Sequence, residues 1–162
     1  MPLPAPSLKG RALRMLAMRE HSRVELERKL RCHEVEPGQM RTVLDDLQAR
    51  GFIDAQRVVD SVVHQRAGTL GVARIRQELQ RKGVGGEEAQ PALAALQASE
   101  VERARQVWRK KFGRRGDDSA NTAPDASQRV REMRFLASRG FSGDAIRRVV
   151  SGADEVPEEP AL

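Results

Sequence analysis

The chain is 162 residues long, enough for one domain of medium size or for a few small units that stack on one another. It carries 29 Lys and Arg against 23 Asp and Glu, a formal net charge of +6 that favours an anionic partner, although an Arg-rich surface also occurs without one. With four Phe, one Trp and no Tyr, it has too few aromatic side chains to bind mainly by stacking on splayed bases, so contacts to phosphate are favoured.

Short segments with helical periodicity follow one another along the chain, and signals for β-strands are nearly absent. We therefore predict an all-α fold. The predicted helices are residues 8–20, 22–33, 37–50, 55–68, 71–82, 87–98, 99–112, 127–139 and 142–150. Outside them, the N-terminus 1–7 and the acidic tail 152–162, which is rich in Pro and Glu, are predicted to be flexible.

Residues at the start of several helices support these boundaries. Ser22 with Glu25, and Ser99 with Glu102, have the spacing of a capping box. In that motif the hydroxyl and the carboxylate each accept a hydrogen bond from a backbone N–H that the helix leaves free. Pro37 suits the first helical position of the third segment, because its fixed φ is already helical.

Other boundaries depend on an aspartate, two glycines and a proline. Asp54 is a natural N-cap for the fourth helix. Gly51 and Gly83 follow helices and suit the left-handed conformation that ends them. Pro91 is unfavourable inside a helix, because it removes a backbone hydrogen bond, so the regular part of the sixth helix should begin near Gln90.

A repeat is visible in three segments that align without gaps. They read RKLRCHEV at 28–35, QELQRKGV at 77–84 and RFLASRGF at 134–141. Leu30, Leu79 and Leu136 coincide in this alignment, at intervals of 79 − 30 = 49 and 136 − 79 = 57 residues. A recurring supersecondary unit at such a period is typical of stacked helical repeats.

The repeat predicts the domain organisation. We assign three-helix repeats to residues 8–53, 54–98 and 99–151, with a mobile linker at 113–127 inside the third. Each repeat resembles a helix-turn-helix without a wing. The repeats are expected to form an elongated, curved array with one long face.

The sequence offers no signature of catalysis, metal binding or membrane insertion. It has no CxxC, HExxH, P-loop, GxGxxG or GxSxG motif, so we predict neither an enzyme nor a cofactor or metal site. Cys32 is the single cysteine and is predicted to be a buried, inert thiol. Asp45 and Asp46 diverge by about 100° on a helix and are predicted to be surface residues. Without a signal peptide or an apolar span, the expected location is the cytoplasm.

Several segments in a fixed order resemble one family. They are REHSRVELERKL (19–30), GFID (51–54), Arg66, Gly71, RIRQELQRKG (74–83), Trp108 with RKKF (109–112), and RFLASRGFS (134–142). In this order, on a threefold helical repeat, the chain resembles the RecX family of regulators of the RecA recombinase. The resemblance extends over about residues 8–150.

The chain departs from the family pattern in four places. After GFID the family tends to have a second acid and then an aromatic residue, where this chain has Ala55 and Val58. Val72 stands where a Pro often follows the glycine, and the linker before the third repeat is longer than usual. These departures concern local packing more than function.

The resemblance implies a partner and an activity. RecX-like proteins bind RecA, especially RecA polymerised on single-stranded DNA, where they lie in the filament groove. They oppose filament extension or promote filament loss, which lowers RecA ATPase activity, strand exchange and the stimulation of LexA cleavage. The expected partners are therefore RecA and its filament on single-stranded DNA, with weak direct contacts to DNA phosphates, for a chain that acts as a monomer.

Basic side chains on three helices are the predicted partner or DNA contacts. They are Arg74, Arg76, Arg81, Lys82, Arg109, Lys110, Lys111, Arg131, Arg134 and Arg139. In the fifth helix Val72, Ile75 and Leu79 form an apolar stripe that predicts core. Trp108 is likewise predicted to pack in a core. The bases after it also suit the negative end of a helix dipole, so they have a structural reason to exist without a partner.

One alternative stays open, a helix-turn-helix transcription regulator that recognises a DNA sequence. Such a protein concentrates its basic residues on one recognition helix. Here they recur in all three repeats, which favours contact along an extended groove.

Overall fold

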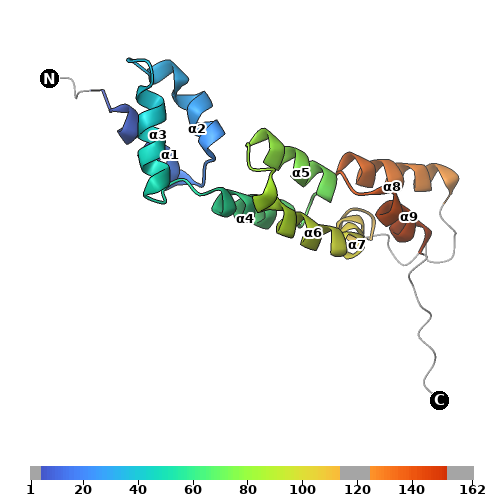
Figure 1. Ribbon diagram of the computed structural model, residues 1–162. Coiled ribbons are helices and arrows are strands. Elements are labelled where there is room, and N and C mark those ends of the chain that lie inside the picture. Colours follow the sequence, from blue (N-terminus) through green and yellow to red (C-terminus); the bar gives the residue numbers. More distant parts are fainter. Residues whose placement is uncertain (1–4, 114–124, 153–162) are drawn as a thin grey trace. The chain divides into compact units, whose positions relative to one another are not determined.

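The computed structural model describes residues 5–113 and 125–152, and all regular secondary structure in them is helical (Figure 1). The α-helices are α1 (Leu8–Met18), α2 (Arg23–Leu30), α3 (Gln39–Ala49), α4 (Ala55–Arg66), α5 (Val72–Arg81), α6 (Gln90–Ala98), α7 (Glu100–Phe112), α8 (Ala126–Ser138) and α9 (Gly143–Ser151). Two 3₁₀ turns, Arg31–His33 and Glu87–Ala89, follow α2 and precede α6. The all-α prediction is confirmed.

The described residues divide into two compact units that differ from the sequence repeat. The first unit contains the chain up to Val62 and the segment Glu78–Gln90. The second contains Val63–Gln77 and the chain from Pro91 onward. The middle set of helices, α4 to α6, therefore contributes to both units.

In the first unit α1, α2 and α3 contact one another around a leucine-rich core (Figure 1). The buried members of this core are Leu8, Ala12, Leu26, Leu30, Leu44, Leu47 and Ile53. On each helix the two buried members lie three or four residues apart, so each helix turns one apolar stripe inward. Burial of such side chains contributes roughly 1.5–3 kcal/mol each.

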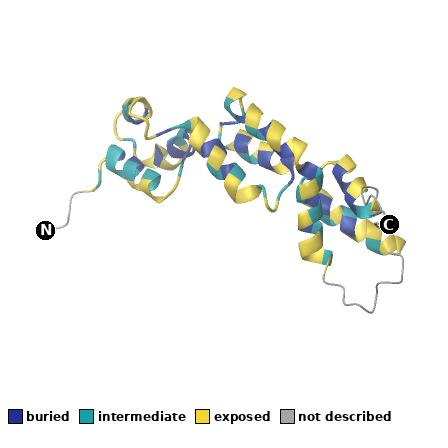
Figure 2. Ribbon diagram, turned by 90° about the horizontal axis from the view of Figure 1, so that it is seen from below, coloured by how far each residue is buried: buried dark blue, intermediate teal, exposed yellow. Residues whose placement is uncertain are grey.

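In the second unit α7, α8 and α9 enclose a separate core. Its buried members are Ala104, Val107, Leu136, Phe141, Ala145, Ile146 and Val149. Trp108 packs against it, as predicted, and its indole Nε1 donates a hydrogen bond of 3.0 Å to Oε2 of buried Glu132. In Figure 2 buried and exposed stretches alternate along the helices.

The predicted core stripe of α5 is also confirmed. Val72 is 5% exposed, and Ile75 and Leu79 are fully buried. The sixth α-helix begins at Gln90 as predicted, so Pro91 occupies its first turn, where a proline removes no helical hydrogen bond.

Several predicted helix ends are present. At α2 the Glu25 N–H donates to Oγ of Ser22 (3.1 Å) and the Ser22 N–H donates to Oε2 of Glu25 (2.9 Å), which completes the capping box. The Arg57 N–H donates to Oδ1 of Asp54 (2.9 Å), the expected N-cap of α4. Gly51 has a φ of 76°, as predicted for a residue that ends a helix.

The second predicted capping box is wrong. Oγ of Ser99 donates backward to the carbonyls of Ala95 (3.1 Å) and Leu96 (3.3 Å), and caps no N–H of α7. Glu102 accepts instead from Nη1 of Arg105 (2.7 Å). The reason is that α6 ends only one residue before α7, so free carbonyls lie within reach of the hydroxyl.

Two further local predictions are also wrong. Pro37 is not in the first turn of α3, because Gly38 adopts a φ of 85° and the helix begins only at Gln39. Cys32 is exposed, since α2 ends at Leu30 and the chain continues in a surface 3₁₀ turn. The bulk of the predicted linker 113–127 and nearly all of the acidic tail 152–162 lie outside the described residues.

Candidate functional site

The basic residues predicted to contact a partner fall into two groups in the structure, one exposed and one engaged in internal contacts. Arg76 and Arg81 on α5 are exposed, and neither is paired with a carboxylate of the described residues. Arg74 is also exposed, but its Nε donates to the carbonyl of Ser138 (3.2 Å). Arg76 and Arg81 are therefore the freer candidates on this helix.

Lys82 is a structural residue of the first unit. Its Nζ donates to Oε1 of Glu25 (2.8 Å), and only 17% of the lysine side chain is exposed. Nη2 of Arg19 donates to the same oxygen (3.0 Å). Burial alone would raise the pKa of Glu25, but hydrogen bonds from Lys82, Arg19 and the Ser22 backbone outweigh it and lower the pKa to about 2. The Lys82 ammonium thus neutralises a buried carboxylate.

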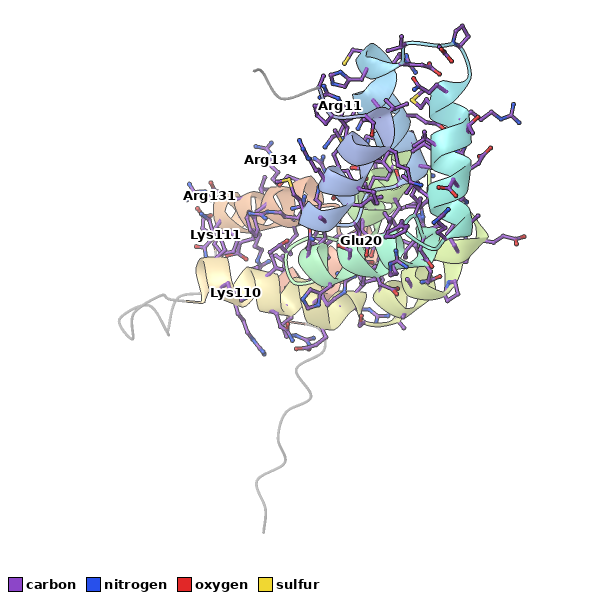
Figure 3. The ribbon with its side chains drawn as sticks, turned by 90° about the vertical axis from the view of Figure 1, so that its left-hand side faces the viewer. Arg11, Glu20, Lys110, Lys111, Arg131 and Arg134 are labelled. Atoms are coloured by element: carbon purple, nitrogen blue, oxygen red, sulfur yellow. The ribbon has the colours of Figure 1, made fainter. Side chains whose placement is uncertain are left out.

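In the second unit, basic residues of α7 and α8 surround a cavity of about 190 Å³. Its lining consists of Gly68, Thr69, Val107, Lys110, Lys111, Phe135 and Arg139. Lys110 and Lys111 are exposed at the C-terminal end of α7 (Figure 3). The Arg139 guanidinium lies over the Phe135 ring, 5.1 Å from its centroid, which is within the range of a cation–π contact.

The remaining candidates lie on the outer surface of the same unit. Arg131 and Arg134 are exposed on α8 (Figure 3) and line a second hollow together with Ala126, Ser127 and Val130. Arg109 is exposed on α7. The structure thus brings Lys110, Lys111 and Arg139 together. Of the other candidates in α7 and α8, Arg109 lies on α7, and Arg131 and Arg134 lie on α8.

A backbone contact positions Arg139 beside the turn between α4 and α5. The Gly71 N–H donates to the carbonyl of Arg139 (2.9 Å), and the Ala73 N–H donates to the carbonyl of Gly140 (3.3 Å). A Cβ atom on Gly71 would lie 2.2 Å from the carbonyl carbon of Gly140, far inside contact distance. Gly140 has a φ of 85°, which strongly favours glycine. Gly71 and Gly140 thus allow the turn before α5 and the turn after α8 to come into backbone contact.

Arg103 was not recognised from the sequence, yet it organises the same region. Its Nη1 donates to the carbonyls of Ala67 (3.1 Å) and Leu70 (2.7 Å), and its Nη2 donates to that of Leu96 (2.8 Å). Burial lowers the pKa of Arg103, although the carboxylate of Glu100 opposes this. No local pattern marks this residue, because all three acceptors belong to backbone outside its own helix.

Glu100, also unrecognised from the sequence, caps another helix. It is 6% exposed, and its Oε1 accepts from the Val72 N–H (3.2 Å) at the start of α5. A carboxylate at the positive end of a helix is stabilising. In the sequence Glu100 lies between Ser99 and Glu102, the two residues of the predicted capping box. Nothing in that local pattern indicates a contact with Val72.

The part of the chain that the structure describes contains no cluster of metal ligands and no membrane-spanning helix. Within residues 5–113 and 125–152, no three His, Cys, Asp or Glu side chains lie close enough to share a metal ion. In the same residues, no helix is both long and apolar enough to cross a membrane.

The fold and the basic site define a class of protein: a tandem series of three-helix units with exposed basic side chains. Models of the first, second and third three-helix domains of RecX match residues 9–47, 54–93 and 98–150, respectively. The chain therefore belongs to the RecX family, a family of regulatory proteins and not of enzymes.

Individual relatives agree with this assignment. The chain is 53% identical over 151 residues to Regulatory protein RecX of Leptothrix cholodnii, covering 93% of this chain and 92% of that one. It is 40% identical over 161 residues to Regulatory protein RecX of Ralstonia pickettii, covering 98% and 97%. Among solved structures, RecX from Lactobacillus salivarius has the same fold, with a TM-score of 0.68, 24% identity and coverage of 91% and 94%.

Proposed function

We propose that this chain modulates the RecA recombinase, mainly as an inhibitor. In this proposal it binds in the groove of the RecA filament on single-stranded DNA and limits filament extension, with the consequent loss of ATPase activity, strand exchange and LexA cleavage. The observation that carries the proposal is the match to all three RecX domains in order, together with relatives named as RecX over nearly their full length.

The charge distribution supports contact with a nucleoprotein partner. Exposed arginines and lysines of α5, α7 and α8 belong to the second and third repeats, so the basic surface is not confined to one recognition helix. The proposal includes a cytoplasmic location and a monomer as the acting species.

The test follows the ATPase activity of RecA on single-stranded DNA while the full chain is added in substoichiometric amounts. We expect progressive inhibition below one molecule per RecA subunit. An unchanged ATPase rate at every ratio would rule out the proposal. The double variant Arg76→Ala/Arg81→Ala should require more protein for the same inhibition than the charge-matched control Arg28→Ala/Arg41→Ala, whose arginines are also exposed.

A sequence-specific transcription regulator is the competing function. It would bind one operator on the order of 10³-fold or more tightly than unrelated DNA. We expect instead similar affinities for unrelated sequences of equal length, measured by fluorescence anisotropy at one salt concentration.

A further inference from the structure

We propose that the cavity between the end of α7, the end of α8 and the turn after α4 is a seat for a backbone phosphate of single-stranded DNA. We call it the phosphate seat. Its lining residues are Gly68, Thr69, Val107, Lys110, Lys111, Phe135 and Arg139. The choice of polymer rests on the proposed function, whereas the choice of a phosphate rests on the cavity itself.

Charge is the first argument for an anion. Lys110, Lys111 and Arg139 line one cavity, and among the described residues none of them pairs with a carboxylate. Other basic side chains of the molecule do pair with a carboxylate, as Arg23 does with Glu27 (2.9 Å). Three cations around one hollow repel each other, and a bound anion relieves that repulsion.

The size and the mixed lining favour a nucleic-acid backbone over a single carboxylate. The cavity has about 190 Å³, whereas about 10–15 Å³ in the same measure is enough to hold one water molecule. Phe135 and Val107 supply an apolar wall, while Lys110, Lys111 and Arg139 supply the charge. A nucleic-acid strand presents both an anionic phosphate and an apolar sugar face at this scale.

The seat is built into the fold. The Gly71 N–H holds the Arg139 carbonyl at 2.9 Å, and Arg103 fixes the carbonyls of Ala67 and Leu70 on either side of Gly68 and Thr69. These contacts set the positions of the wall before any ligand arrives. Preorganised donors lose less entropy on binding than free surface side chains do.

The aromatic wall is fixed as well. Phe135 meets Phe112 edge to face, with ring centroids 5.4 Å apart and an angle of 88° between the rings. The Arg139 guanidinium carbon lies over the Phe135 ring, 5.1 Å from its centroid, and this cation–π contact keeps the guanidinium beside the aromatic wall. The planar fork of a guanidinium matches two oxygens of a phosphate.

Trp108 provides a readout close to the seat. It is the single tryptophan of the chain, and its ring lies 6.3 Å from Phe112, which in turn contacts Phe135. Filling of the cavity is therefore expected to change the fluorescence of Trp108, and there is no tyrosine emission to obscure it.

The experiment uses the full chain without RecA and a fluorescein-labelled oligothymidylate, with anisotropy measured over a series of salt concentrations. Variants Lys110→Ala, Lys111→Ala and Arg139→Gln remove one charge each from the seat. Variants Arg28→Ala and Arg41→Ala remove one exposed charge each outside the seat, and serve as matched controls.

We expect each seat variant to lose about fivefold to tenfold in affinity and each control less than twofold. The slope of log K against log salt should fall by about 0.7 for each lost phosphate contact. Equal losses in both sets would show a diffuse basic surface and overturn the proposal, as would an unchanged affinity in all seat variants. If Arg139→Gln unfolds, judged by circular dichroism, the two lysine variants decide.

Two further outcomes separate this proposal from the proposed function. If the seat variants keep their affinity for the oligonucleotide but lose inhibition of RecA, the cavity receives a protein carboxylate and the phosphate seat is wrong. If the seat variants lose affinity for the oligonucleotide while the unmodified chain fails to inhibit RecA, the seat stands and the proposed function falls. Titration with inorganic phosphate should change Trp108 emission in the unmodified chain, and failure at every concentration would count against the seat.

Discussion

The ammonium of Lys82 lies 2.8 Å from the carboxylate of Glu25, a residue 57 positions earlier in the chain. The pair joins the turn after α5 to the first turn of α2 within one compact unit. A lysine that the sequence suggests as a partner contact is thus held inside the molecule, because a buried carboxylate without a counter-charge is costly.

Removal of the Lys82 charge should destabilise the first unit. We expect Lys82→Ala to lower the free energy of unfolding by about 1–3 kcal/mol, since Glu25 keeps only Arg19 and a backbone N–H as charge-stabilising partners. Urea denaturation measures this. The matched control is Arg81→Ala, one residue earlier and exposed, for which a change above about 0.5 kcal/mol is not expected. Equal effects of the two substitutions would contradict the structural role of Lys82.

Acidification should destabilise the protein through Glu25. Its pKa is lowered to about 2 in the folded state, against about 4.3 in an unfolded chain. The stabilisation is therefore complete above about pH 4.3 and is lost as the pH falls towards 2. The free energy of unfolding should fall by on the order of 3 kcal/mol, because each unit of pKa difference corresponds to about 1.4 kcal/mol. Unfolding at stepped pH values measures it, and Glu25→Gln should flatten the dependence in this window.

Replacement of Gly71 should be far more damaging than replacement of a nearby glycine. In Gly71→Ala the new Cβ would meet the Gly140 carbonyl carbon at 2.2 Å, so the two backbones must move apart. We expect a loss of about 2 kcal/mol or more in thermal or urea unfolding. Gly68→Ala is the control, because no atom lies within 4 Å of its added Cβ. A Gly71→Ala variant as stable as that control would contradict the close backbone contact.

Even a conservative replacement of Arg103 should destabilise the protein. Its guanidinium spans carbonyls of Ala67, Leu70 and Leu96, a set that the single ammonium of a lysine does not match. We expect Arg103→Lys to cost about 1–3 kcal/mol of folding free energy, measured by urea denaturation. Arg109→Lys, at an exposed position of the same helix, should change stability by less than about 0.5 kcal/mol.

Cys32 should react freely in the folded protein. It lies exposed in the turn after α2, where its thiol has only a long contact of 3.9 Å to the Lys29 carbonyl. A thiol reagent such as a maleimide should therefore modify it in native buffer at nearly the rate seen in denaturant. Strong protection in the native protein would show that the thiol is buried.

The features that were predicted correctly from the sequence are those that depend on residues close together along the chain. The leucine stripes, the Ser22 capping box and the glycine stops follow from spacing within one helix, and they are present. The partners of Lys82, Glu100 and Arg103 lie 28 or more residues away in their longest contacts, so no local pattern identifies them. The grouping of Lys110 and Lys111 with Arg139 likewise depends on the packing of α7 against α8.

The backbone contact between Gly71 and Arg139 bears on how the protein can be divided into fragments. A piece that stops at the end of α6 would look complete by the sequence repeat. It would nevertheless leave the N–H of Val72 and the carbonyls of Ala67 and Leu70 without the side chains of Glu100 and Arg103. The repeats of the sequence and the compact units of the structure therefore do not coincide. An expression fragment that ends after residue 98 should be less stable than the full chain.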